Sequence, residues 1–213
     1  MTMDKHGKTQ RKQILRPIQN EELAEFVGIM MGDGGMSKYQ ATITLHHLDD
    51  SQYSEFVVTL IQRLFGYTPS IYHKPKKSVL DIVMSRIEIV DFLNTLGLPI
   101  GNKISQCLDV PDWIRQNSTF AIACIRGLID TDGSIFTHTY KSKGKNYSYK
   151  KLSFTSASES LVHTVYFLLS GLGFHPRISR NGKDVRLESI SDVKRYFEII
   201  GSDNPKHLNR FAS

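Results

Sequence analysis

Hydrophobic and polar positions follow one order of patterns twice along the chain. Each half begins with a stretch that is apolar on all sides, which predicts a buried helix. Alternating apolar and polar positions then predict a hairpin, and an amphipathic helix, a second hairpin and a closing helix follow. The helices and first hairpins are expected at 23–31, 36–48, 51–64 and 87–96 in the first half, and at 119–130, 134–154, 158–172 and 193–200 in the second.

Turn signals agree between the halves as well. The amphipathic helices close on LFGYTPSI and LGFHPRI, in which Gly66, Pro69 and Ile71 correspond to Gly173, Pro176 and Ile178. The pair Asn181–Gly182 predicts a two-residue turn with positive φ angles. These patterns together predict an α+β fold in which αββαββα occurs twice. The expected divisions are a basic extension at 1–20, repeats at 21–108 and 119–213, and a linker at 109–118 that contains the helix breaker Pro111.

Both buried helices end in Asp-Gly, at GDG 32–34 and TDG 131–133. Small residues four apart, Gly28 and Gly32 in one helix and Gly127 and Thr131 in the other, let two helix backbones approach closely. We therefore expect the helices to pack together, so that Asp33 and Asp132 meet. Two carboxylates at helix C-termini repel each other and the helix dipoles, and a divalent cation removes that repulsion.

The alternative interpretation is that Asp-Gly is ordinary turn chemistry. Gly34 and Gly133 would then be left-handed C-caps, which fits either copy taken alone. Two copies in equivalent positions favour a shared site. A calcium-binding loop does not fit, because counting from Asp130 the sixth position is Ile135 and the twelfth is Lys141.

FVGIMMGDG (26–34) and IRGLIDTDG (125–133) resemble the two motifs of a monomeric LAGLIDADG homing endonuclease, and the resemblance extends over residues 21–210. Met31 replaces the motif's sixth-position acid. The resemblance implies two four-stranded antiparallel sheets that form a DNA-binding saddle, with the motif helices between pseudo-twofold halves. It also implies Mg²⁺ held by Asp33 and Asp132 with the carbonyls of Gly32 and Thr131. The implied activity is double-strand cleavage of a long asymmetric site that leaves short 3′ overhangs.

The family also places a basic residue near each active centre, after the last helix of each half. The matching stretches are LGLPIGNK and IGSDNPK, so Lys103 and Lys206 are the corresponding residues, expected to stabilise the phosphorane-like transition state. The alternative is that each is an exposed lysine that balances a helix dipole.

Charge adds support for a nucleic-acid partner. The net charge is +6, and basic residues cluster before the first helix, around His73 and Lys74, and at 137–151. Any single cluster is equally consistent with an ordinary solvated surface. The residues expected to contact DNA from the strands are Lys38, Gln40, Thr42, Thr44, His46, Lys74, Lys76, Tyr140, Lys141, Tyr147, Tyr149, Arg177, Arg180, Lys183 and Arg186.

Composition excludes several classes of protein. No apolar run approaches the ~20 residues that span a bilayer, and no apolar stretch follows the basic N-terminus, so we expect an intracellular protein, cytoplasmic or organellar, without a membrane partner. Cys107 and Cys124 form no CxxC pair, which argues against a disulfide framework or a thiolate zinc site. Because one chain carries both motifs, we expect a monomer.

Three rival functions use the same fold. The first is an RNA maturase that binds intron RNA without cleaving it, and the second is a DNA-binding regulator, although such proteins generally lose the acids that this chain keeps. The third is an endonuclease domain of an intein. An intein requires a nucleophile at its start and a terminal His-Asn, whereas this chain begins MTMDKHGK and ends HLNRFAS, so we expect a free-standing protein.

Overall fold

Each half of the computed structural model, which describes residues 13–74 and 78–213, has the predicted order αββαββα. Lys76 lies outside the described residues. The first half comprises α1 (Glu21–Met31), β1 (Gly34–Met36), β2 (Ala41–His46), α2 (Ser51–Phe65), β3 (Ser70–Lys74), β4 (Val79–Met84) and α3 (Ile87–Thr95). The second comprises α5 (Ser118–Asp132), β5 (Gly133–Ser142), β6 (Lys145–Thr155), α6 (Glu159–Gly171), β7 (Arg177–Ile178), β8 (Asp184–Leu187) and α7 (Ile190–Ile199).

Two helices lie outside this repeat. A short α4 (Asp112–Arg115) occupies the expected linker, and α8 (Pro205–Ala212) ends the chain. The start of α8 has a recognisable local cause: the Asn204 side chain accepts a hydrogen bond from the Lys206 backbone N–H, and Pro205 stands in the first turn, where its missing N–H costs nothing. Within 13–74 and 78–213, no helix is both long enough and apolar enough to cross a bilayer.

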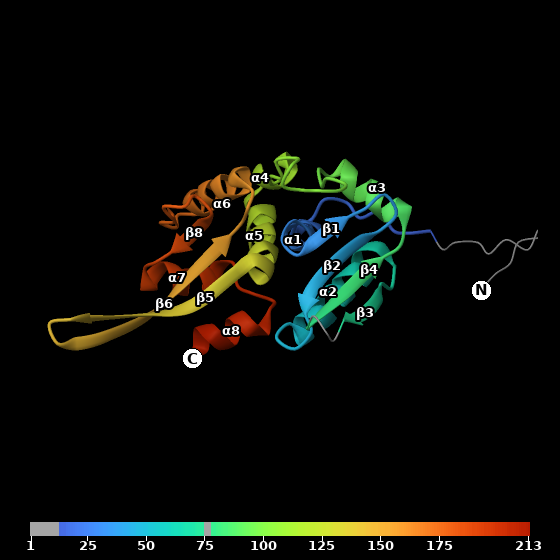
Figure 1. Cartoon of the computed structure of the whole chain (residues 1–213). Coiled ribbons are helices and arrows are strands. Elements are labelled where there is room, and N and C mark those ends of the chain that lie inside the picture. Colours follow the sequence, from blue (N-terminus) through green and yellow to red (C-terminus); the bar gives the residue numbers. More distant parts are fainter. Residues whose placement is uncertain (1–12, 75–77) are drawn as a thin grey trace, which may run out of the picture.

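The described strands form two four-stranded antiparallel sheets with the same topology, β1-β2-β4-β3 and β5-β6-β8-β7. Figure 1 shows α1 and α5 side by side at the centre, with one sheet on each side. Alternation along β2 is as expected: Ala41, Ile43 and Leu45 are buried, and the residues between them face the opposite side. The α+β pseudo-twofold prediction is confirmed.

The position of the tight turn was predicted wrongly. Gly182 has a φ of 70°, but Asn181 does not have a positive φ, and residues 179–183 form a longer connection. The Asn181 side chain instead accepts hydrogen bonds from the Ser179 hydroxyl and the Lys183 backbone N–H. Consecutive positive φ angles occur at Lys143 (47°) and Gly144 (78°), between β5 and β6. This turn closes a long hairpin that projects beyond the body of the molecule (Figure 1).

The first hairpin of the first half is shorter than predicted. Residues 36–48 were expected to be strand-like throughout, but β1 ends at Met36 and β2 begins at Ala41. Lys38 and Gln40 therefore lie in the connection rather than on a strand face, because the Ser37 N–H bonds to the Gln40 carbonyl and turns the chain there. Both remain exposed.

Candidate functional site

The backbones of α1 and α5 touch at two glycines. A Cβ added to Gly28 would lie 2.3 Å from the Cys124 carbonyl oxygen, and one added to Gly127 would lie 2.4 Å from the Glu25 carbonyl oxygen. Neither position has room for a methyl group. The close helix contact predicted from the spacing of small residues is therefore present, and it fixes how the two halves meet.

The C-terminal ends of the two helices converge. A Cβ on Gly32 would lie 2.0 Å from Thr131 Oγ1 and 3.4 Å from Asp132 Oδ2, so the residue before Asp33 stands against the other motif. The Asp-Gly glycines are not left-handed caps, because Gly133 has φ −88° and ψ 161°, and Gly34 also lacks a positive φ. The interpretation of these glycines as left-handed C-caps is thus wrong.

Asp33 and Asp132 share a partly buried environment that disfavours their charged forms. Burial, followed by repulsion from Asp132 and Asp50, raises the pKa of Asp33 to about 7. Burial also raises the pKa of Asp132. Lys103 opposes both shifts, and Lys206 opposes that of Asp33. The structure therefore brings together the two acids and the two lysines that were predicted for the site.

Lys103 reaches this site from the connection after α3. Its Nζ donates to the carbonyl of Met31 at 2.8 Å and to that of Gly32, at the C-terminus of α1. It is half-buried, and burial lowers its pKa while Asp132 and Asp33 raise it. Lys103 is therefore not an exposed lysine at the end of its own helix: it caps the helix that carries the first motif.

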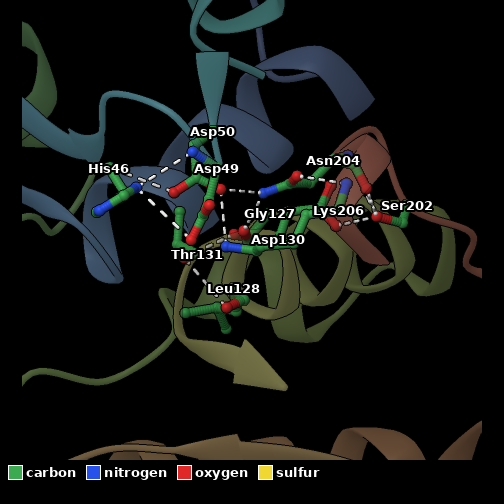
Figure 2. A network of polar contacts seen from close by, with 10 residues as sticks. All are labelled: His46, Asp49, Asp50, Gly127, Leu128, Asp130, Thr131, Ser202, Asn204 and Lys206. Carbon is green, nitrogen blue, oxygen red and sulfur yellow. Dashed lines mark hydrogen bonds and ion pairs between the residues drawn. The ribbon is translucent and has the colours of Figure 1, made fainter. Parts of the chain in front are cut away.

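Lys206, in the first turn of α8, takes a different partner. Its Nζ forms an ion pair with Asp50 Oδ1 at 2.7 Å, where both side chains are largely buried. Asp50 immediately precedes α2, so this pair joins the second half to the first (Figure 2). Asp50 was not predicted as a site residue, because nothing in its local sequence indicates a contact 156 positions away.

Asp33 and Asp132 fit a divalent cation by the chemistry of their donor set. Carboxylate oxygens are the ligands that Mg²⁺ prefers, and these two repel each other in a partly desolvated place. The Gly32 carbonyl already accepts from the Lys103 ammonium, which shows that positive charge is favoured there. The two aspartates are therefore the residues that would hold a metal ion.

A second group of acids has a different character. Oxygens of Glu25, Asp130 and Asp203 lie within 4.8 Å of one another, and burial raises the pKa of Glu25 to about 8 and that of Asp130 to about 7. However, the Arg126 guanidinium pairs with Glu25 at 2.7 Å and with Asp203 at 2.9 Å. A cation is thus already built into this cluster, which joins α1, α5 and the segment before α8.

Metal-free stability should depend on pH through Asp33. Because its folded-state pKa is about 7 and its ordinary value is 3.8, the folded state holds this proton more tightly, and the stabilisation is lost as pH rises through about 7. We expect the melting temperature of the metal-free protein to fall between pH 5 and pH 8. The fall should be smaller in Asp33→Asn, and Mg²⁺ should raise the melting temperature of the parent at pH 8. Equal pH slopes in parent and variant would contradict this.

The residues expected to contact DNA are accessible wherever the structure describes them. Thr42, Thr44 and Gln40 line a hollow together with Asp33, so this strand face continues into the acid site. Arg177, Arg180 and Arg186 line a second hollow in the other half. The remaining residues are exposed or half-buried: Lys38, His46, Lys74, Tyr140, Lys141, Tyr147, Tyr149 and Lys183.

Several of these cations are held by acids on a strand of the same sheet or directly after one. Lys74 pairs with Asp81, Arg186 pairs with Asp184 at 3.2 Å, and Arg177 lies 3.4 Å from Glu188. On the projecting hairpin, the rings of Tyr140 and Tyr147 stack with centroids 5.3 Å apart. Ion pairs and ring stacking thus hold several of these side chains in defined positions on the sheets.

Comparison with known proteins identifies the architecture. A family model described as a LAGLIDADG-like domain matches residues 119–208, which contain the second motif. The structure of the I-LtrWI LAGLIDADG homing endonuclease bound to target DNA is similar over 89% of this chain and 88% of that chain, at a TM-score of 0.59 and 14% identity. The chain has the LAGLIDADG fold, and its second half matches the LAGLIDADG-like domain.

Other LAGLIDADG-fold structures are similar as well. An I-DmoI variant in complex with its target DNA in the presence of Mn is similar over 85% of this chain and 93% of that chain. The TM-score is 0.55 and the identity is 18%. Full-length DUF199/WhiA from Thermatoga maritima covers 92%, at a TM-score of 0.58 and 16% identity, and the chain covers 61% of it. The same fold thus occurs in a protein that is not named as a nuclease.

Two curated relatives match most of this chain. An A-type ATP synthase subunit of Pyrococcus horikoshii is 28% identical over 78% of the chain, and the replication factor C small subunit of Methanocaldococcus jannaschii is 24% identical over 90%. The chain spans only 15% and 10% of these relatives' own lengths.

Proposed function

We propose that this protein is a site-specific, Mg²⁺-dependent double-stranded DNA endonuclease of the homing type. The observation that carries the proposal is the convergence of Asp33 and Asp132 at the ends of two helices in backbone contact. Retention of both acids distinguishes it from a DNA-binding regulator with the same fold. One chain supplies both halves, so we propose that it acts as a monomer.

The chain's own residues supply metal binding and charge stabilisation. Asp33 and Asp132 would hold the metal, and the Gly32 and Thr131 carbonyls would add ligands. Bound Mg²⁺ supplies Lewis-acid stabilisation of phosphate oxygens and lowers the pKa of water. Lys103 and Lys206 place two ammonium groups beside the acids, where they stabilise negative charge that develops on each scissile phosphate. We propose one phosphodiester cut in each strand, with short 3′ overhangs.

The two sheets would lie along the duplex and read it. Thr42 and Thr44 share a hollow with Asp33, so bases read by β2 lie next to the cut. Arg177, Arg180 and Arg186 in the other half have no counterparts of the same type, and arginine reads guanine bidentately. Because the two halves present different side chains, the target site is asymmetric.

Duplex binding should be strongly salt-dependent. The net charge is +6, and phosphate contacts by lysine and arginine release counterions, so log affinity is expected to fall by about 0.9 per phosphate contacted for each tenfold rise in salt. Fluorescence anisotropy with a labelled duplex in Ca²⁺, across a series of salt concentrations, measures the slope. An affinity that does not change with salt would contradict the basic-surface assignment.

The deciding experiment is cleavage selection from a randomised duplex library in Mg²⁺, with an EDTA arm as control. We expect a long asymmetric sequence to be enriched only in Mg²⁺. An RNA maturase is the alternative outcome, since basic loops also suit RNA. If the protein enriches no cleaved duplex but binds structured RNA tightly, the endonuclease proposal fails.

A further inference from the structure

The two site lysines have chemically different partners. Lys206 Nζ pairs with the Asp50 carboxylate at 2.7 Å, so the two charges offset each other. Lys103 Nζ donates to the backbone carbonyls of Met31 and Gly32, which carry no net charge. Lys103 would therefore act with its full charge near one scissile phosphate. Lys206 would act near the other phosphate as half of an ion pair.

The difference arises at equivalent positions of the two repeats. Asp50 is the residue before α2, and Ser158 is the residue before α6, the corresponding helix. Ser158 lines a hollow with Lys103 and Asp132, and its hydroxyl donates to the Leu108 carbonyl at 2.7 Å. One half thus has a carboxylate where the other has a neutral hydroxyl.

Asp50 is held firmly in this position by both halves. It accepts from the buried Asn204 Nδ2 at 2.9 Å and from the His46 backbone N–H at 3.2 Å. Asn204 Nδ2 also donates to the Asp130 carbonyl at 3.0 Å, which ties the pair to the second motif helix (Figure 2). Although burial opposes it, hydrogen bonds from Lys206 and Asn204 lower the pKa of Asp50, so it stays ionised.

The two lysines differ in how they relate to the two acids. Lys103 lines a hollow with Asp132 and acts on the pKa of both acids, most strongly on that of Asp132, whereas Lys206 acts on the pKa of Asp33. We propose that Asp50 is a positioning residue that offsets the charge of Lys206, so that the strand served by Asp33 and Lys206 is cut more slowly than the strand served by Asp132 and Lys103. This inference rests on the proposed endonuclease function.

Strand-resolved kinetics test the proposal. With both strands of a selected duplex end-labelled, Lys206→Met and Lys103→Met identify which strand each lysine serves. We expect the strand that Lys206→Met slows to be the slower one in the parent, with a nicked intermediate accumulating. Asp50→Asn keeps one acceptor oxygen for Lys206 and Asn204, loses the acceptor for the His46 N–H and removes the charge, so it should accelerate that strand by about threefold to tenfold and leave the other unchanged.

Controls connect the effect to Lys206. In the Lys206→Met background, Asp50→Asn should have a much smaller strand-specific effect, because only its direct repulsion of Asp33 remains, and Ser158→Asp should slow the strand that Lys103 serves. Equal strand rates in the parent, the opposite order, or an unchanged ratio in Asp50→Asn would overturn the proposal. So would an Asp50→Asn effect of undiminished size without Lys206, since Asp50 would then not act through the lysine.

A metal-free measurement separates this inference from the proposed function. Unfolding of Asp50→Asn, Lys206→Met and the double variant should show a coupling of roughly fivefold or more in the unfolding equilibrium constant. The pair Ser158→Ala and Lys103→Met should show little coupling. An uncoupled Asp50–Lys206 pair in a protein that cuts both strands refutes only this inference. A coupled pair in a protein that cuts neither strand refutes the proposed function and the strand order with it.

Discussion

Replacing Asp33 or Asp132 by asparagine is expected to abolish double-strand cleavage, with a loss on the order of a thousandfold or more in the rate of the affected cut. Asparagine keeps the size and shape of the side chain but removes the charge that draws the metal. Binding of the duplex should survive. In metal-free buffer it should be equal or tighter, because a carboxylate near phosphates repels them until a cation neutralises it.

The measurement compares cleavage and binding on one selected duplex, in Mg²⁺ and in Ca²⁺, for the parent and both variants. Ca²⁺ has looser coordination geometry, so it should support binding with little cleavage. Asp112→Asn, an exposed acid in α4, is the matched control and should cut at the parental rate. If either site variant cuts at that rate too, Asp33 and Asp132 are not the metal-binding pair.

Adding one methyl group at the centre of the helix pair should destabilise the protein substantially. In Gly28→Ala the new Cβ would lie 2.3 Å from the Cys124 carbonyl oxygen and 3.1 Å from its carbon, and backbone atoms cannot rotate aside as a side chain can. Separating α1 from α5 affects the whole interface between the halves. We expect a loss of about 1–3 kcal/mol in the free energy of unfolding, measured by denaturant titration.

Gly171→Ala is the matched control, because Gly171 also lies in a helix and an added Cβ would meet nothing within 4 Å. That variant should be as stable as the parent or slightly more stable, since alanine favours the helix. If Gly28→Ala proves as stable as Gly171→Ala, the close approach of the two helices is not what joins the halves.

Features that depend on local periodicity were predictable from sequence. The repeated αββαββα order followed from hydrophobic patterning, and the helix contact followed from the spacing of Gly28, Gly32 and Gly127. The convergence of Asp33 and Asp132 then required only that two like helices pack in the same sense. These inferences needed no knowledge of side-chain contacts between distant segments.

Features that depend on distant contacts or on competition between local structures were not predictable. The Asp50–Lys206 and Glu25–Arg126 pairs join residues 156 and 101 positions apart, and each exists only because the halves dock in one way. Asn181–Gly182 is a strong turn signal, yet the Asn181 side chain bonds locally to Ser179 and Lys183 and a longer connection results. Turn formation at Lys143–Gly144 carried a weaker signal in the sequence.

The central claim is that the paired ends of α1 and α5 form a DNA-cleaving site. Mapping the products of a selected duplex, labelled on both strands, at nucleotide resolution in Mg²⁺ and in EDTA tests it most directly. The predicted result in Mg²⁺ is one cut in each strand, offset to leave short 3′ overhangs, with the duplex intact in EDTA. A protein that binds the duplex tightly in Mg²⁺ while both strands stay intact would contradict the claim.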